Sequence, residues 1–145
     1  MPNITLYTSP YITVEYWPDK ALIYHTIHQP INEHVDMFKT ALDAGTEGMA
    51  KYKVRKWLSD DRKNDSLTEE GNQWSMNVWQ PKTLKAGWKY WAMVVPEDLA
   101  AAGTLMPVIE ILYELGLRMS VFTTLENAIA WLDEVDKEPV NQPSA

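Results

Sequence analysis

Hydrophobic and polar residues alternate in the first part of the chain with the period of β-strands. The alternation covers Ile12–Tyr16 and Ala21–His28, on either side of the sequence WPDK at positions 17–20. Proline fixes the backbone of a turn and aspartate can hydrogen-bond its own backbone, so the pattern predicts a β-hairpin. The shorter stretch Ile4–Tyr7 is expected to form an additional edge strand or a loose arm.

Apolar residues then recur with the period of α-helices. Their spacing predicts an amphipathic helix over residues 33–44 that ends near Gly45 and Gly48, and a second helix over residues 67–84. Pro81 removes a backbone donor from that second helix, so we expect a kink or an early end there.

The rest of the chain alternates strand and helix patterns. Strand patterns lie at residues 53–58, 88–95 and 118–122, and apolar helical patterns lie at residues 104–115 and 123–135. This order is typical of parallel strands that are joined by helices.

The order of all these elements predicts one α/β domain over residues 1–135. Its sheet is expected to be mixed and mostly parallel, with four or five strands starting at the hairpin, four helices and right-handed crossovers. A capping box of Thr123 and Glu126 would begin the last helix. Residues 136–145 are charged and contain proline, so we expect a disordered tail.

Composition excludes several kinds of site. The chain of 145 residues contains no cysteine, which excludes disulfides, thiolate metal sites and cysteine nucleophiles. Its net charge of −7 disfavours nucleic acid as a partner, because such binding usually rests on a basic surface.

The first residues lack the basic and apolar regions of a signal peptide, and no stretch is long enough for a transmembrane helix. We therefore expect a soluble, cytoplasmic protein without membrane insertion.

No catalytic or metal-binding signature is visible. His25, His28 and His34 have neither the HExxH spacing nor a recognisable partner carboxylate, so we expect isolated surface or half-buried histidines. The six glycines form no phosphate-binding loop. We predict a protein without enzymatic activity, metal or cofactor. The alternative is an enzyme that lacks a recognisable signature.

Asp60, Asp61 and Asp65 form an acidic loop after a predicted strand. Ligands of α/β folds usually bind beyond the carboxyl ends of strands. The loop has two interpretations: a surface for a basic protein partner or a weakly held divalent cation, or a solvated turn whose aspartates cap the following helix. The fixed spacing of oxygen ligands and the turn glycine of a calcium loop are absent.

The predicted helix between Leu105 and Leu115 is apolar in nearly every direction, with Glu110 and Glu114 as its charged residues. A helix that is apolar on all sides must be buried on all sides, and the sheet covers only one. The second helix also has an additional apolar face. Three explanations stay open: a broad core, a homodimer interface, or a groove for an apolar ligand. The candidate residues for these contacts are Met76, Trp79, Ile109, Ile111 and Leu112.

Several segments, in this order, match a known family over Ile12–Val135. They are WLSDDR (57–62), LTEE (67–70) leading to Trp74, AGWK (86–89) before AMVVP (92–96), and FTTLENAIAWL (122–132). With them the chain resembles the SpoIIAA-like, or STAS-like, family of small bacterial proteins. That family contains anti-sigma-factor antagonists and stand-alone relatives, and its fold is akin to that of CRAL-TRIO lipid-carrying domains.

The resemblance implies a function and a regulatory site. Anti-sigma-factor antagonists are phosphorylated on a serine at the start of the second helix, within an Asp-Ser-Ser/Thr-Gly pattern. Asp65 and Ser66 match that pattern and the next two residues depart from it, so Ser66 and Thr68 are the candidate phosphorylation sites. The implied function is a non-enzymatic protein-binding or regulatory module, expected to be a homodimer.

The kinship with CRAL-TRIO domains implies an alternative. In that case the chain is a carrier or sensor of a small apolar, lipid-like molecule. The expected pocket is lined by tryptophans, namely Trp57, Trp74, Trp88 and Trp91.

Overall fold

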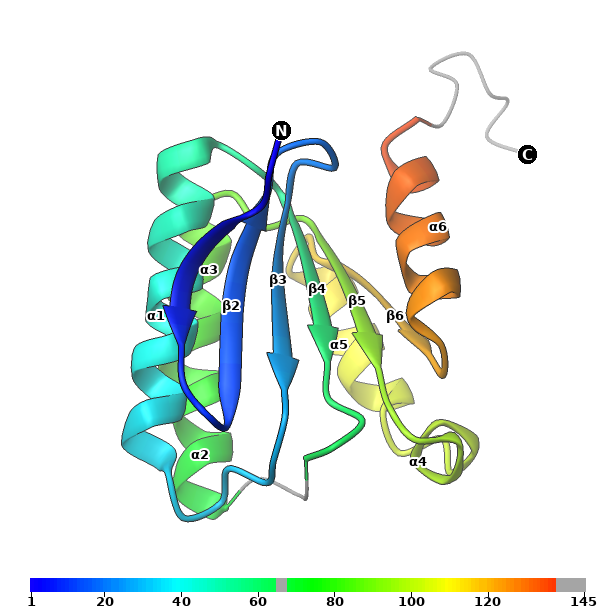
Figure 1. Cartoon of the computed structure of the whole chain (residues 1–145). Coiled ribbons are helices and arrows are strands. Elements are labelled where there is room, and N and C mark those ends of the chain that lie inside the picture. The colour runs from blue at the N-terminus through cyan, green and yellow to red at the C-terminus, as the bar shows by residue number, and fades with distance from the viewer. Residues whose placement is uncertain (65–67, 138–145) are drawn as a thin grey trace, which may run out of the picture.

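The computed structural model describes residues 1–64 and 68–137. Within these residues the chain forms one sheet of six strands, which lie side by side in the order in which they occur in the sequence (Figure 1). The strands are β1 (Ile4–Thr8), β2 (Ile12–Trp17), β3 (Leu22–Ile27), β4 (Lys56–Asp60), β5 (Tyr90–Val94) and β6 (Arg118–Phe122). Strands β1 to β3 pair antiparallel, whereas β3 to β6 pair parallel.

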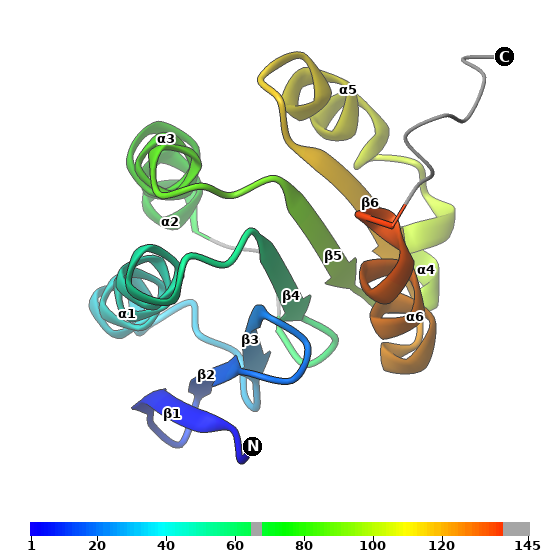
Figure 2. The same ribbon diagram turned by 90° about the horizontal axis from the view of Figure 1, so that it is seen from above.

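The helices lie on both faces of this sheet. They are α1 (Val35–Tyr52), a second helix made of α2 (Glu69–Trp74), η1 (Ser75–Trp79) and α3 (Gln80–Lys85), then α4 (Glu97–Ala101), α5 (Met106–Glu114) and α6 (Leu125–Val135). Figure 2 shows α1, the second helix and α5 on one face and α6 on the other. Each connection between parallel strands steps to the next strand in the same direction, which places its helix on the same face. Helix α6 follows the last strand and is free to cover the opposite face.

The α/β class, the initial hairpin and the mixed, mostly parallel sheet are confirmed. The strand at the N-terminus is an edge strand, β1, so the described residues form six strands and not four or five. They also form five helices, counting α2, η1 and α3 as one, because the sequence pattern does not predict the short helix α4. Helix α4 contains no buried residue, and therefore carries no amphipathic pattern from which it could be recognised.

Side chains alternate between two apolar layers, as the period of a strand requires. The layer beneath α1, the second helix and α5 is the larger and contains Trp57, Trp79, Trp88 and Trp91. The layer beneath α6 is built from small and branched residues, namely Leu22, Leu58, Ala92, Val94, Ala128 and Leu132.

Helix α1 runs through Gly45 and Gly48, so the predicted end near these glycines is wrong. A Cβ atom on Gly45 would lie 2.3 Å from Cη2 of Trp57, and one on Gly48 would lie 2.6 Å from Cδ1 of Leu6. Both glycines therefore allow the helix to approach the sheet closely. The helix ends only at Tyr52, and its C-cap residue Lys53 adopts a left-handed conformation with φ of 56°.

The second helix continues past Pro81 to Lys85, so of the expected kink or early end at this proline, the early end does not occur. The helix widens immediately before the proline, where the backbone N–H of Gln80 donates to the carbonyl of Ser75 across a π-turn. Pro81 then lies in the first turn of α3, where a missing N–H costs little. Thr83 and Thr46 share a hydrogen bond of 2.8 Å that fixes α3 to α1 inside the core.

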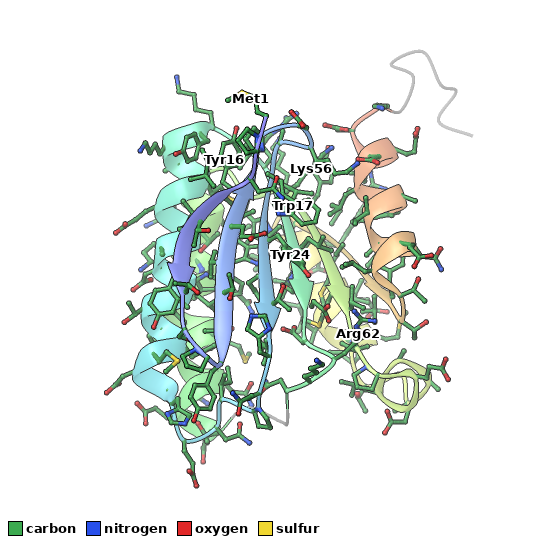
Figure 3. The ribbon with its side chains drawn as sticks, viewed as in Figure 1. Met1, Tyr16, Trp17, Tyr24, Lys56 and Arg62 are labelled. Carbon is green, nitrogen blue, oxygen red and sulfur yellow. The ribbon has the colours of Figure 1, made fainter. Side chains whose placement is uncertain are left out.

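Two details at the C-terminal end differ from the expectation. Thr124, and not Thr123, caps α6, because its hydroxyl oxygen accepts from the backbone N–H of Asn127. The predicted tail starts with Asp136, whose carboxylate binds the Lys56 ammonium group at 3.0 Å. Lys56 lies at the start of β4 and also donates to the carbonyl of Leu132, which ties α6 to the sheet (Figure 3). The remainder of the predicted tail, 138–145, lies outside the described residues.

Gly45→Ala is expected to lower the free energy of unfolding by about 1–2 kcal/mol. Overpacking a core costs about 1–3 kcal/mol, which exceeds the gain in helix propensity of about 1 kcal/mol. Urea denaturation measures the change. Gly48→Ala is the matched control and should lose less, because its new Cβ meets the mobile end of Leu6. A Gly45→Ala protein as stable as the parent would contradict the close packing on Trp57.

Candidate functional site

A cavity of about 610 Å³ opens on the larger apolar layer, between the second helix and α5. This volume is in the usual range of small-molecule sites, about 300–1,000 Å³. Its lining comes from several helices and strands and the loops beside them. The apolar residues of the lining are Ile27, Phe38, Leu42, Met76, Trp79, Trp91, Met93, Val95, Pro96, Leu99, Leu105, Val108, Ile111 and Leu112.

The cavity exists because the two helices pack on different neighbours. The second helix packs against α1 through α3, and α5 packs on β6. Strand β5 lies between them, as the view along the sheet shows (Figure 2). Trp91 and Met93 point from β5 toward this layer and contribute to the lining. The fold thus leaves a groove above β5.

Trp91 and Trp79 line the cavity and belong to a cluster with Trp57 and Trp88 behind it. In the five contacting pairs of this cluster the ring centroids lie 4.9–5.9 Å apart, in tilted or edge-to-face arrangements. Such arrangements are the favourable ones for aromatic pairs. The indole N–H of Trp91 donates to the Ser59 hydroxyl at 2.8 Å. The tryptophan rings at the cavity are therefore fixed by packing against each other and by a hydrogen bond to the sheet.

The tryptophans that line the cavity differ from the expected set. Trp91 is part of the lining, whereas Trp57 and Trp88 lie in the core beneath it and Trp74 packs edge-on against Phe38. Trp79, predicted on the second apolar face of its helix, is buried and takes part in the lining. Its indole N–H has no hydrogen-bond partner among the described residues.

His25 is a polar residue of the lining and is only 3% exposed. Its Nδ1 accepts a hydrogen bond of 2.9 Å from the indole N–H of Trp57. An indole N–H can only donate, so Nδ1 carries no proton and the proton of the neutral ring is on Nε2. That proton is donated to the carboxylate of Asp61, 2.8 Å away. The expectation of an isolated histidine is therefore wrong for His25. His28 is exposed and bonds to Thr13.

This bonding limits the chemistry of His25. A general base needs a free nitrogen lone pair within reach of the substrate proton. Nδ1 is occupied by Trp57 and Nε2 is a donor to Asp61, so neither nitrogen offers one in this arrangement. Ser59 is completely buried under Trp91. The residues described here contain no group of three or more His, Asp or Glu side chains that could hold a metal ion.

The structure separates the residues of the predicted acidic loop. Asp60 is the last residue of β4, is buried, and binds Arg62 through both carboxylate oxygens at 2.8 and 2.9 Å. Figure 3 shows Arg62 at the end of the sheet opposite Lys56. Burial alone would raise the pKa of Asp60, but the hydrogen bonds from Arg62 hold it below its usual value. Asp61 contacts His25, and Asp65 lies outside the described residues. Asp60 is thus not part of an exposed acidic surface.

The candidate residues on α5 and the second helix differ in burial. Leu112 is buried, Ile109 is half-buried, and Ile111 lines the cavity although 58% of it is exposed. Met76 lines the cavity from the second helix and is 61% exposed. Tyr113 and Leu115 do not line the cavity and are 68% and 62% exposed. Large apolar side chains of α5 and its C-cap therefore stay exposed among the described residues.

Of the two candidate phosphorylation sites, Thr68 is described and Ser66 is outside the described residues. The hydroxyl oxygen of Thr68 accepts from the backbone N–H of Gly71 and caps α2.

Among the described helices, none is both long and apolar enough to cross a membrane. No protein-family model, curated protein or solved structure matches this chain.

His25→Leu is expected to lower the free energy of unfolding by about 1–3 kcal/mol, because it leaves the buried N–H of Trp57 without an acceptor. Urea denaturation followed by tryptophan fluorescence measures the effect. His28→Leu, one residue after the end of the same strand, is the matched control. Its exposed side chain should change stability by no more than about 0.5 kcal/mol. Equal effects of the two substitutions would show that the Trp57 bond contributes nothing specific.

Proposed function

We propose that this protein binds a small apolar molecule in the cavity between the second helix and α5, as a carrier or sensor. The observation that carries this proposal is the cavity itself, whose lining is mostly apolar and includes the exposed side chains of Met76 and Ile111. Burial of such surface contributes roughly 25 cal/mol per Å². A ligand would provide the burial that these side chains lack in the chain alone.

The rigidity of the tryptophan cluster at the cavity supports the same proposal. Trp91 is fixed by a hydrogen bond to Ser59, and the indoles of Trp79 and Trp88 are packed against it. A preformed site binds more tightly because less side-chain freedom is lost on binding. The hydrogen bonds of His25 and the complete burial of Ser59 favour binding over catalysis as the activity.

The neutral fluorescent probe N-phenyl-1-naphthylamine tests the proposal. It should bind with one site per chain and a micromolar dissociation constant, with an increase in its fluorescence. Val108→Trp places a large ring in the cavity and should weaken binding at least tenfold.

Tyr113→Trp is the matched control, because it adds an indole to α5 at a position outside the cavity lining. It should bind the probe as the parent does. Failure of the parent to bind, or equal binding by the Val108→Trp protein, would contradict the proposed site.

A second candidate function is a STAS-like protein-binding or regulatory module that forms a homodimer through α5. Exposed Tyr113 and Leu115 favour it, since apolar side chains of this size gathered on one helix often mark an interface. The hairpin followed by αβ units is also the element order on which the resemblance to that family rests. Regulation at Ser66 or Thr68 and a cytoplasmic location belong to this candidate.

Tyr113→Glu tests the second candidate. The parent protein should be a dimer by native mass spectrometry and light scattering, and Tyr113→Glu should be a folded monomer by circular dichroism. Ile4→Glu is the control, because it adds the same charge at an exposed apolar position on the opposite edge of the sheet. A parent protein that stays monomeric at high micromolar concentration would exclude this dimer.

A further inference from the structure

Among the described residues, the ionisable side chains that line the cavity are two aspartates and His25. Asp61 and Asp98 are the carboxylates of the lining, and no lysine or arginine among the described residues is part of it. Asp61 follows β4 and Asp98 lies in α4, directly after β5. The carboxyl ends of parallel strands meet at one edge of a sheet, so both carboxylates lie at the same end of the apolar cavity.

The charge of Asp61 is not compensated by its partner. The indole of Trp57 holds His25 as a neutral ring that donates from Nε2, so the contact between His25 and Asp61 joins a neutral group to a carboxylate. The backbone N–H of Asp61 also donates to the carbonyl of Val94 at 2.9 Å, which fixes the loop beside β5. The site therefore holds a positioned negative charge at the end of an apolar space.

Neighbouring groups do not reverse this charge. Arg62 is bound to Asp60, and neither Arg62 nor the exposed Lys63 lines the cavity. The N-terminus of α5 would favour an anion by a factor of about two to five. One carboxylate 4 Å from a ligand charge changes affinity about fivefold even in water, and more in a partly enclosed site. The preference of two carboxylates for a cation therefore exceeds the preference of one helix N-terminus for an anion.

We propose that the ligand of this cavity is a small cationic amphiphile, with an apolar alkyl or aryl body and a protonated amine or quaternary ammonium head at Asp61 and Asp98. The inference rests on the proposed function, because it assigns a ligand class to the same cavity. It sets this site apart from one built for the negatively charged head of a fatty acid or phospholipid.

Three ligands with the same alkyl chain and different head groups are compared at pH 7: decylammonium and decanoate below their micelle concentrations, and decanol below its solubility limit. Their dissociation constants are measured by displacement of N-phenyl-1-naphthylamine from the full chain. Decylammonium should bind at least fivefold more tightly than decanol, and decanoate at least fivefold more weakly than decanol. Added salt should reduce both differences, because it screens exposed charges.

Substitutions locate the source of the preference. Asp98→Asn and Asp61→Asn should each reduce the ratio between the affinities for decylammonium and decanoate at least fivefold, because each substitution weakens attraction of the cation and also relieves repulsion of the anion. The amide oxygen introduced by Asp61→Asn can still accept the hydrogen bond from His25, so this substitution removes the charge and keeps the contact. Glu97→Gln is the matched control, since it removes a neighbouring charge of α4 that is not part of the lining. In the Glu97→Gln protein the ratio between the affinities for decylammonium and decanoate should equal that of the parent.

Each other outcome overturns the inference. If decanoate binds as tightly as decylammonium, the cavity is a site for apolar molecules without the proposed head, and the proposed function stands. If Glu97→Gln lowers the ratio as much as the two aspartate substitutions, or Val108→Trp leaves the affinity for decylammonium unchanged, decylammonium binds to the general negative charge of the surface. If neither probe nor ligand binds to the parent, the proposed function fails together with the inference.

Discussion

The indole of Trp57 joins the parts of the molecule on which the cavity depends. One edge of the ring lies under Gly45, so its size sets how closely α1 approaches the sheet. Its N–H holds the ring of His25, and its faces and edges meet Trp79 and Trp88. A smaller residue at this position would leave His25 without its donor and the indoles beneath the cavity without support. Packing and hydrogen bonding at one buried side chain thus determine both the shape of the core and the state of a polar group at the site.

The cavity itself follows from the way the sheet is connected. Successive crossovers place three helical segments on one face, each displaced by one strand from the last. Helix α1 and the second helix are joined by the buried hydroxyl pair of Thr46 and Thr83, whereas α5 packs toward β6. The groove over β5 is therefore a consequence of topology, and the loop after β4 and helix α4 after β5 place Asp61 and Asp98 in its lining. Neither carboxylate is near the other in sequence, although the parallel register places both at one edge.

Most of the fold could be predicted from local patterns, and most of the site could not. The hairpin, the parallel strands and α6 have clear periodicity, and the apolar excess of α5 indicates a surface that is partly exposed among the described residues. The prediction of a helix end at Gly45 fails because a glycine carries no sign of the ring that packs on it. The partners of His25 are equally non-local, since Trp57 and Asp61 reach it only through the pairing of β3 with β4. A parallel pairing of these two strands, drawn from the sequence with the register His25 opposite Ser59, would have placed both partners beside it.

The π-turn at Ser75–Trp79 makes the second helix one residue longer than a regular helix of the same span. Each residue turns an α-helix by about 100°. Deleting one residue from this turn would restore regular winding and rotate the preceding turn, including Asn72, away from its present direction while Thr83 kept its hold on α1. The wall that faces α5 is thus defined by a single extra peptide unit. In a homologous chain without this extra residue, the helix would be rotated. Different positions of the helix would then face the cavity, even if the residues that line it here were all retained.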